Sequence, residues 1–325
     1  MYETPFHSQP ISDKIFVVTG AAGFIGSHLV EYLLVHGAKE VRGFDNLLTG
    51  RQENVDLFAS HKNYRFIKGD ICNPEDLKQV FSGADYLLHQ AALGSVPRSI
   101  KDPAATNRIN IDGFLNVLVA ARDAGIKRVV YASSSSVYGD HPVLPKVEAH
   151  TGNPLSPYAV TKKTNELYAR VFSDVYQMEL IGLRYFNIFG PRQDPNGPYA
   201  AVIPLFISLL RKQQSPTING DGKQTRDFTF VSNAVQANIK ALFTINKEAL
   251  NQVYNVAVGE NFSLLDLCHT LNALLDSSIE PLHREDRAGD IRNSLADISK
   301  AKQYFNYDPT VRFKEGLKIT IQHEV

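Results

Sequence analysis

A glycine-rich segment that follows a short apolar run constrains the fold of this chain more than any other feature. The run Ile15–Thr19 leads into Gly20, Gly23 and Gly26, and the helical periodicity of Phe24–His36 begins within the same segment. Glycines let the backbone approach a phosphate closely, and the N-terminus of the helix that follows faces the anion. The spacing G-x-x-G-x-x-G therefore predicts the pyrophosphate-binding loop of a dinucleotide fold.

An acidic residue after the next apolar run indicates which dinucleotide is bound. Asp45 ends the predicted strand Glu40–Asp45, nineteen residues after Gly26. A carboxylate at this place accepts hydrogen bonds from the adenosine ribose and repels a 2′-phosphate. A glycine-rich turn beside an unrelated surface carboxylate is the alternative. The register of strand, helix and acid favours NAD.

Apolar, β-branched runs alternate with amphipathic stretches through the first half of the chain. This alternation is typical of βαβ units, and it predicts an α/β fold with a Rossmann-type, doubly wound parallel sheet. We expect Phe24 and Ile25 to point into the interface between the first helix and this sheet. The predicted strands are Ile15–Thr19, Glu40–Asp45, Tyr64–Gly69, Tyr86–His89, Arg128–Ser133 and Glu179–Tyr185. The predicted helices are Phe24–His36, Pro74–Phe81, Ala104–Asp123 and one that opens at Ser156 and runs to Tyr176.

The character of the sequence changes after Gly190, where Pro191, Pro195, Gly197 and Pro198 cluster. We expect residues 1–13 to be an N-terminal extension and residues 14–190 to form the NAD-binding domain. Residues 191–325 are expected to form mainly a smaller C-terminal α/β lobe that binds the substrate, with some segments returning to the first domain.

Composition excludes several classes of protein. Thirty-four basic and thirty-four acidic side chains leave no net charge, so the broad basic field of a nucleic-acid-binding protein is missing. Two cysteines form no disulfide framework, and the ten histidines lack metal-ligand spacing, so we expect no metal site. No apolar run approaches the ~18 residues of a membrane span, and the first dozen residues lack the pattern of a signal peptide. We therefore expect a cytoplasmic protein with no membrane partner.

Tyr158 and Lys162 stand four residues apart, on one face of the helix that opens at Ser156. The positive helix end, the Lys162 ammonium and a bound oxidised nicotinamide would each lower the pKa of the Tyr158 phenol, as a general base requires. The spacing alone is weak, since an exposed helical pair would look the same. Serines at the end of a buried strand, Ser133 to Ser136, strengthen it, because open α/β sheets bind ligands at that edge.

These motifs in this order resemble the extended short-chain dehydrogenase/reductase family, and within it the nucleotide-sugar 4-epimerases. The resemblance rests on the glycine loop, the serine-rich stretch Ala132–Gly139, Tyr158-x-x-x-Lys162 and Leu183–Gly190, and it covers nearly the whole chain from about Lys14. It implies that Tyr158 is the base, that Lys162 is its partner and a ligand of the cofactor ribose, and that Ser134 is the catalytic serine. It further implies that NAD is lined by Gly20, Gly23, Phe24, Ile25, Gly26, Asp45, Asn46, Gly50, Asp70, Ile71, Ala91, Ala92 and Asn110.

The resemblance also implies a nucleotide-sugar site. Ser135 and Ser136 would lie close to the sugar, Asn187 would hold the diphosphate, and Tyr199 would belong to the loop that contacts uracil. Arg226 and Arg287 have planar guanidinium groups suited to a diphosphate, and Asp290 suits a ribose diol. Surface ion pairing, for instance between Arg287 and Asp290, is the alternative interpretation.

An absent motif narrows the reaction. Sugar 4,6-dehydratases of this family carry Thr-Asp-Glu before Val-Tyr-Gly, whereas this chain has Ser134, Ser135 and Ser136 there. Without that acid–base pair, elimination is disfavoured. The expected reaction is epimerisation through a 4-keto sugar: Tyr158 takes the O4 proton, NAD accepts the C4 hydride, and the hydride returns to the other face of the sugar. The cofactor should stay bound between turnovers.

The residue at one position indicates which sugar is the substrate. Strict galactose epimerases carry a bulky tyrosine where this chain has Ser294, and a serine leaves room for an N-acetyl group. Interconversion of UDP-GlcNAc and UDP-GalNAc is therefore the first choice. The corresponding uronic acids, whose carboxylate could pair with Arg98, and plain UDP-glucose/UDP-galactose are the alternatives. A non-catalytic NAD-binding regulator and a net oxidoreductase or decarboxylase complete the hypotheses.

The resemblance implies a homodimer as well. The amphipathic stretches Asp112–Asp123 and Tyr158–Tyr176 would cover the sheet and pair with a second copy in a four-helix contact. Exposed apolar residues such as Leu167 and Val171 are the sequence feature that such a contact requires.

Overall fold

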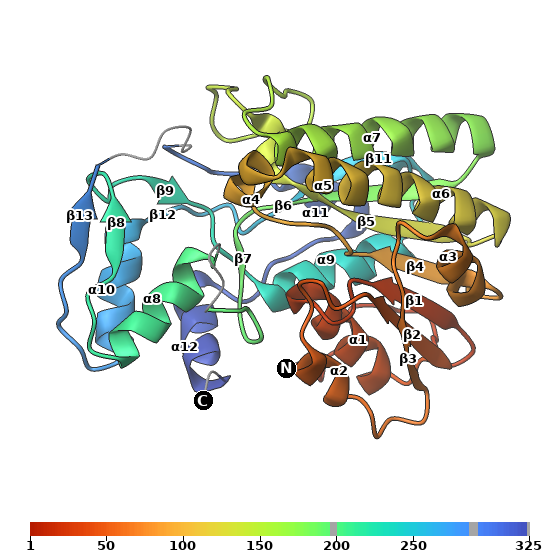
Figure 1. Ribbon diagram of the computed structural model, residues 1–325, viewed down its shortest axis with the longest axis horizontal. Coiled ribbons are helices and arrows are strands. Elements are labelled where there is room, and N and C mark those ends of the chain that lie inside the picture. Colours follow the sequence, from red (N-terminus) through yellow and green to blue (C-terminus); the bar gives the residue numbers. More distant parts are fainter. Residues whose placement is uncertain (196–199, 286–291, 324–325) are drawn as a thin grey trace.

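A parallel seven-stranded sheet forms the centre of the molecule in the computed structural model, which describes residues 1–195, 200–285 and 292–323 (Figure 1). Its strand order is β3-β2-β1-β4-β5-β6-β11, and every neighbouring pair is parallel. The order reverses between β1 and β4, the place where doubly wound sheets bind ligands beyond the carboxyl ends of the strands. The predicted Rossmann-type sheet is confirmed.

The strands and helices agree closely with the sequence pattern. The sheet consists of β1 (Ile15–Thr19), β2 (Glu40–Asp45), β3 (Tyr64–Lys68), β4 (Tyr86–His89), β5 (Arg128–Ser134), β6 (Glu179–Tyr185) and β11 (Gln252–Val256). The helices of the first half are α1 (Phe24–Val35), α2 (Gln52–Asp56), α3 (Pro74–Phe81), α4 (Val96–Lys101), α5 (Pro103–Asn107), α6 (Gly113–Asp123) and α7 (Pro157–Tyr176). Predicted boundaries differ from these by one residue at the ends of α1, β3 and β5. The α7 helix begins as predicted, with the Ser156 hydroxyl accepting from the Ala159 N–H and with Pro157 in the first turn.

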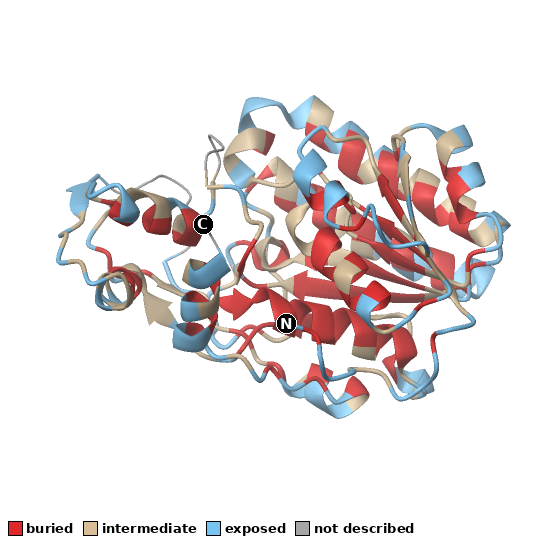
Figure 2. Cartoon of the chain, turned by 90° about the horizontal axis from the view of Figure 1, so that it is seen from below, coloured by how far each residue is buried: buried red, intermediate tan, exposed pale blue. Residues whose placement is uncertain are grey.

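Two apolar layers enclose the sheet. Side chains of α3, α6 and α7 pack on one face, and those of α1, α9 (Val231–Phe243) and α11 (Ser299–Phe305) pack on the other. Figure 2 shows the strands almost entirely buried between these layers. Both α9 and β11 come from beyond residue 190, so the C-terminal half does return to the sheet. The boundary of the domains at residue 190 itself stays a prediction.

The predicted helix Ala104–Asp123 is wrong in one respect, because a π-helical turn over Arg108–Asp112 separates α5 from α6. The cause is tertiary. The Asn110 side chain accepts from the Leu93 N–H at 2.7 Å and donates to the Leu93 carbonyl at 3.1 Å. The Asn110 carbonyl in turn accepts from Asn165 of α7 at 2.7 Å. Turns of this kind are frequent at functional sites.

The remaining elements form a smaller C-terminal lobe, seen at the left of Figure 1. Its helices are α8 (Val202–Arg211), α10 (Leu264–Leu274) and α12 (Phe313–His323), and they share an apolar cluster that includes Phe206, Leu267 and Phe313. Its strands pair as β8 (Thr217–Asn219) with β13 (Leu282–Arg284) and β9 (Thr225–Arg226) with β12 (Phe262–Ser263). The short strands β7 (Ile188–Phe189) and β10 (Thr229–Phe230) join it to the sheet.

Phe24 and Ile25 lie only in part where the sequence suggested. Both pack against the apolar cluster of the C-terminal lobe, and only Ile25 also contacts the core between α1 and the sheet. Both residues lie in the first turn of α1, where their side chains meet the second lobe. The predicted position is therefore wrong for Phe24, whereas Ile25 contacts both the core beside the sheet and the second lobe.

The N-terminal extension is packed against the outer surface of α1. Tyr2 and Ile11 are buried, and the Phe6 ring stacks on the Tyr32 ring with centroids 5.3 Å apart. The Tyr2 hydroxyl also hydrogen-bonds to His28 Nδ1 at 2.9 Å.

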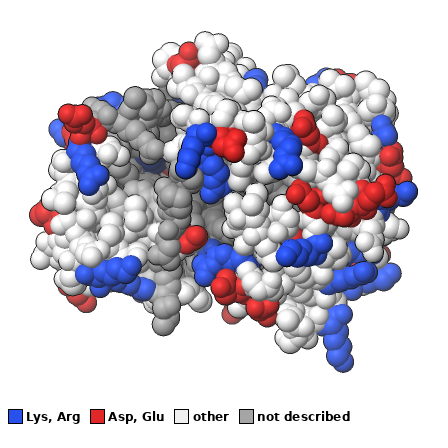
Figure 3. All heavy atoms as spheres, viewed as in Figure 1, with Lys and Arg blue, Asp and Glu red and all other residues white. Residues whose placement is uncertain are grey.

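Within the described ranges, no helix is long and apolar enough to cross a membrane. Lys and Arg are interspersed with Asp and Glu on the face shown in Figure 3, so no region of a single sign dominates that face. The cytoplasmic location stays a prediction.

A buried ion pair fastens α7 to the sheet. Arg184 of β6 donates from Nε and Nη2 to the two carboxylate oxygens of Glu166, each at 2.8 Å, and the two side chains are only 3% and 8% exposed. Ser133 of β5 donates to the same carboxylate at 2.6 Å. The neighbouring strands β5 and β6 therefore both bond to one carboxylate of α7, the helix that also carries Tyr158 and Lys162.

Replacing Glu166 by leucine should lower the free energy of unfolding by about 3–5 kcal/mol, because the Arg184 charge is then buried without a partner. The double variant Glu166→Leu/Arg184→Met should recover much of that loss, since no lone charge remains. Denaturant unfolding measures both. The exposed pair Arg170–Asp174 on the same helix is the control, and Asp174→Asn should have a far smaller effect. A double variant no more stable than Glu166→Leu would contradict the account.

Candidate active site

The glycine loop has the close backbone packing that a pyrophosphate cradle needs. A Cβ atom on Gly26 would lie 2.0 Å from the Gly20 carbonyl oxygen, and one on Gly20 would lie 2.7 Å from the Ala91 nitrogen. Gly20 also has a φ of +70°, which favours glycine. The first turn of α1 therefore lies against the end of β1 with no room for a side chain between them. This cradle fits the pyrophosphate of a dinucleotide.

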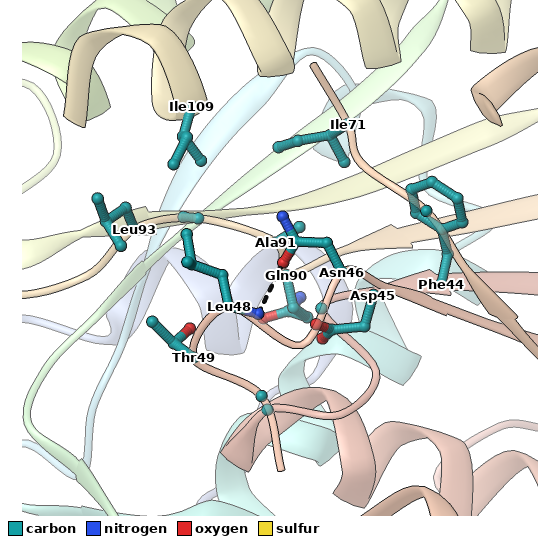
Figure 4. Close-up of a pocket in the computed structure, with 15 residues that line it drawn as sticks. Phe44, Asp45, Asn46, Leu48, Thr49, Ile71, Gln90, Ala91, Leu93 and Ile109 are labelled. Carbon is teal, nitrogen blue, oxygen red and sulfur yellow. Dashed lines mark hydrogen bonds between the residues drawn. The ribbon is translucent and has the colours of Figure 1, made fainter. Parts of the chain in front are cut away.

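A cavity lies along the carboxyl ends of β1, β2 and β4 (Figure 4). Eight of the residues predicted to hold the cofactor line it: Gly20, Gly23, Asp45, Asn46, Gly50, Ile71, Ala91 and Ala92. In Figure 4, Ile71 and Ile109 lie across the cavity from the loop that carries Leu48 and Thr49. The lining combines apolar side chains such as Ile71 and Ile109 with polar ones such as Asp45 and Asn46, a combination that suits an adenosine.

Asp45 is fixed by its neighbours. Its carboxylate accepts from the Ala22 N–H at 3.0 Å and from the Leu47 N–H at 2.8 Å. Burial raises the pKa of the Asp45 carboxyl, and these N–H donors oppose that shift. A Cβ on Gly50 would lie 2.9 Å from the carboxylate, so glycine is needed for the loop to close over Asp45.

Sequence reasoning missed several lining residues, namely Phe44, Leu48, Thr49, Gly69, Gln90, Leu93 and Ile109. Gly69 and Gln90 directly follow β3 and β4, and Phe44 is the penultimate residue of β2. The position of a residue at a carboxyl-terminal strand end is the signal that could have found them.

Other predicted cofactor residues lie outside the cavity lining. Gly26 acts behind the loop, as described above, and Phe24 and Ile25 face the C-terminal lobe. Asp70 accepts from Asn46 Nδ2 at 3.2 Å and from the Cys72 N–H at 2.8 Å. Asn110 is engaged with Leu93 and Thr161. Their direct contact with a cofactor stays a prediction.

The structure brings the predicted catalytic residues together. Tyr158 lies in the first turn of α7 with Ser134 of β5 as its hydrogen-bond partner. Lys162, one turn further, lies with Nζ 6.0 Å from the centre of the Tyr158 ring and donates to the Ala132 carbonyl at 2.7 Å. Burial lowers the pKa of Lys162 to about 8, and the Glu166 carboxylate opposes this shift.

The lowered pKa expected for Tyr158 includes the charge of a bound nicotinamide, so it stays a prediction. Burial raises the pKa of the Tyr158 phenol, and the hydrogen bond with Ser134 only partly offsets it. The sequence shows the two favourable charges but not the depth at which the phenol lies. Lowering this pKa towards neutrality therefore requires a further positive charge at the site.

The neighbouring serines differ from one another. The Ser134 hydroxyl accepts from the Ser136 N–H at 3.1 Å. The Ser136 hydroxyl is buried and has no partner among the described residues, so a ligand hydroxyl would satisfy it. Ser135 lies between them in the same short 3₁₀ turn. His89 accepts or donates at Thr19, 2.8 Å away, consistent with a structural role.

Residues predicted to bind the nucleotide come from segments far apart in the sequence. Asn187, between β6 and β7, donates to the Asp227 carbonyl at 3.1 Å. Arg226 donates to the carbonyls of Thr225 and Arg292, and the Ser294 N–H donates to the Thr225 carbonyl at 3.1 Å. Arg226 and Ser294 are thus held on the same short stretch of backbone. Tyr199, Arg287 and Asp290 lie outside the described residues.

No group of three or more His, Cys, Asp or Glu side chains that could hold a metal ion occurs in the described part of the chain. The site offers a dinucleotide cradle, a half-buried tyrosine beside a buried lysine, and a hydroxyl cluster. This arrangement suits proton transfer coupled to hydride transfer at a carbon that carries a hydroxyl group.

Comparisons with known proteins agree with this chemistry. The sequence profile of the NAD dependent epimerase/dehydratase family matches residues 16–257. A putative UDP-glucose 4-epimerase of Methanocaldococcus jannaschii is 37% identical over 306 residues, which is 94% of this chain and 96% of that protein.

Solved structures are similar over nearly their full length. The UDP-N-acetylglucosamine 4-epimerase of Methanobrevibacter ruminantium, in complex with UDP-N-acetylmuramic acid, is 41% identical with a TM-score of 0.91, covering 96% of this chain and 98% of that one. A variant of the UDP-glucuronic acid 4-epimerase of Bacillus cereus, in complex with a fluorinated UDP-glucuronic acid and NAD, is 32% identical with a TM-score of 0.87, covering 95% and 98%. The chain therefore belongs to the NAD dependent epimerase/dehydratase family, as an NAD-dependent UDP-sugar 4-epimerase, which is an isomerase.

Proposed function

We propose that this epimerase interconverts UDP-GlcNAc and UDP-GalNAc. The observation that carries the proposal is the place of Ser294. Its N–H donates to the Thr225 carbonyl, so its backbone lies next to the short strand that ends at Arg226, a predicted diphosphate ligand. A hydroxymethyl group there leaves space next to the nucleotide, where a tyrosine would fill it. That space suits the acetamido group of an N-acetylhexosamine.

In the proposed mechanism, the chain's own residues hold the sugar and move one proton. Tyr158 takes the proton of the sugar O4 hydroxyl, with Ser134 sharing the hydrogen bond. Lys162 holds the ribose of the cofactor and keeps a positive charge near the phenol. A bound NAD would supply the acceptor for the C4 hydride, and the charge of its nicotinamide would help to lower the pKa of Tyr158.

The nucleotide must stay anchored while the 4-keto sugar rotates to present its other face. Asn187, Arg226 and Arg287 would hold the diphosphate, with Asp290 on the ribose and Tyr199 in the uracil loop. Ser135 and Ser136 would contact the sugar. After the sugar has rotated, the hydride would return to the other face of C4 while Tyr158 returns its proton to O4, so that the configuration at C4 is inverted.

Substrate preference distinguishes the alternatives. Protein without added NAD is incubated with UDP-GlcNAc, UDP-glucose and the uronic acid of UDP-GlcNAc, and the C4 epimers are separated by chromatography. The wild type should prefer UDP-GlcNAc. Ser294→Tyr should lower kcat/KM for UDP-GlcNAc by about tenfold or more and leave UDP-glucose much less affected, because bulk now occupies the acetamido space.

Asn293→Tyr is the matched control, since it adds the same bulk at the exposed neighbouring position. It should leave kcat/KM unchanged for both UDP-GlcNAc and UDP-glucose. A wild type that prefers UDP-glucose would refute the argument from Ser294, and preference for the uronic acid would favour the role of Arg98. NADH that accumulates in step with product would favour an oxidoreductase or decarboxylase.

We further propose a homodimer built on α6 and α7. Four apolar side chains on α7 are strongly exposed: Val160 at 47%, Leu167 at 60%, Val171 at 52% and Val175 at 64%. Their spacing of seven, four and four residues places them on one stripe of the helix. In Figure 1, α7 and α6 lie together on the outer face of the sheet, so a second copy could pair with both.

Leu167→Glu should shift the protein from dimer to monomer, because a carboxylate at the centre of an apolar contact is left without a partner. Analytical ultracentrifugation at micromolar concentration measures the change. Ile245→Glu alters a more exposed residue, 87% accessible, away from α7 and should leave the mass unchanged. A wild-type monomer, or a dimer that survives Leu167→Glu, would contradict the proposed contact.

A further inference from the structure

A fully buried carboxylate joins the C-terminal lobe to the central sheet. Asp227 has 0% exposure and lies between β9 and β10. Its two oxygens accept from the N–H groups of Val258 at 3.0 Å, Gly259 at 3.0 Å and Ala296 at 3.3 Å. Val258 and Gly259 lie just beyond β11, after Ala257, and Ala296 lies on the segment that returns from the C-terminal lobe. The Asp227 side chain therefore links its own segment of backbone to two others.

Two of the segments that meet at Asp227, its own and that of Ala296, also carry a predicted nucleotide ligand. Arg226 is the residue immediately before it, and Ser294 stands two residues before Ala296. Asn187 bonds to the backbone on both sides of Phe228. The Asn187 side-chain amide donates to the Asp227 carbonyl at 3.1 Å, and the Asn187 carbonyl accepts from the Thr229 N–H at 3.2 Å. The backbone positions of Asn187, Arg226 and Ser294 thus share one reference point.

The location of Asp227 is costly for folding, which calls for a reason. Burial raises the pKa of the Asp227 carboxyl to about 7, and the nearby Glu260 carboxylate acts in the same direction, against three N–H donors. An apolar side chain would fill the space without that penalty, but it could not accept from three backbone donors at once. The arrangement is what is needed to hold irregular backbone at a fixed geometry beside a polar site.

We propose that Asp227 is a positioning residue for the nucleotide diphosphate of the substrate. It does not reach the substrate itself, because the carboxylate is buried and occupied by backbone donors. It acts through Asn187, Arg226 and Ser294, whose relative placement it sets. The inference rests on the proposed roles of these three residues, and it predicts that nucleotide binding depends on Asp227 while cofactor binding does not.

The variant Asp227→Asn keeps the size of the side chain and removes one acceptor oxygen. It should weaken the binding of UDP, measured by calorimetry on the cofactor-loaded protein, by about tenfold or more. KM for the UDP-sugar should rise by a similar factor while kcat changes little, since Tyr158, Lys162 and Ser134 are untouched. The affinity for NAD should stay the same, because the cavity at the ends of β1, β2 and β4 is lined by none of the segments that Asp227 contacts.

Asp266→Asn is the matched control. Asp266 also lies in the C-terminal lobe and also accepts from a backbone N–H, at the start of α10, but it contacts none of the three anchoring residues. It should leave the dissociation constant of UDP unchanged. Equal weakening in both variants would show a merely structural role, and an unchanged constant in Asp227→Asn would overturn the proposal.

A second measurement covers the case in which Asp227→Asn does not fold. In the wild type, UDP should increase the hydrogen-exchange protection of the Val258 and Gly259 amides, which bond to Asp227 and are not predicted ligands. Unchanged exchange at these amides in UDP-saturated protein would overturn the proposal. A wild type that binds no UDP at all would instead refute the proposed nucleotide site, so the two failures are distinguishable.

Discussion

The contact between Gly26 and the Gly20 carbonyl is the constraint on which the rest of the structure depends. At that separation a single methyl group would force the first turn of α1 away from the end of β1. Because the two segments meet without side chains, the helix N-terminus, Asp45 and the Ala91–Ala92 backbone surround one cavity. Phe24 and Ile25, in the same first turn of α1, pack on the C-terminal lobe, so the cofactor loop and the substrate lobe share a packing surface.

The catalytic side of the cleft is organised by a different element, the α7 helix. Its first turn holds Tyr158, its second holds Lys162, and its third holds Glu166. Lys162 and Glu166 bond to consecutive residues of β5, the Ala132 carbonyl and the Ser133 hydroxyl, and the next residue is Ser134. A buried ion pair with Arg184 therefore lies directly behind the residues that are proposed to move the proton.

Much of the fold could be predicted, because strand and helix periods are local properties of the sequence. The interruption of the helix at Asn110 could not, since it depends on Leu93 and Asn165, which are distant in the chain. The depth of Tyr158, and with it the raised pKa, was equally hidden. Motif spacing located Tyr158, Lys162 and Asp45, whereas the role inferred for Asp227 depends on amides more than thirty and nearly seventy residues away.

The central claim is that C4 is inverted by hydride removal and return at one tightly held cofactor. Its most direct test uses a UDP-sugar that carries deuterium at C4, incubated with the protein in ordinary water without added NAD. The account predicts an epimer that keeps the deuterium at C4, formed by the wild type and slowed by about 10²–10⁴-fold in Tyr158→Phe. Deuterium lost to solvent, or an epimer formed equally fast by Tyr158→Phe, would contradict it.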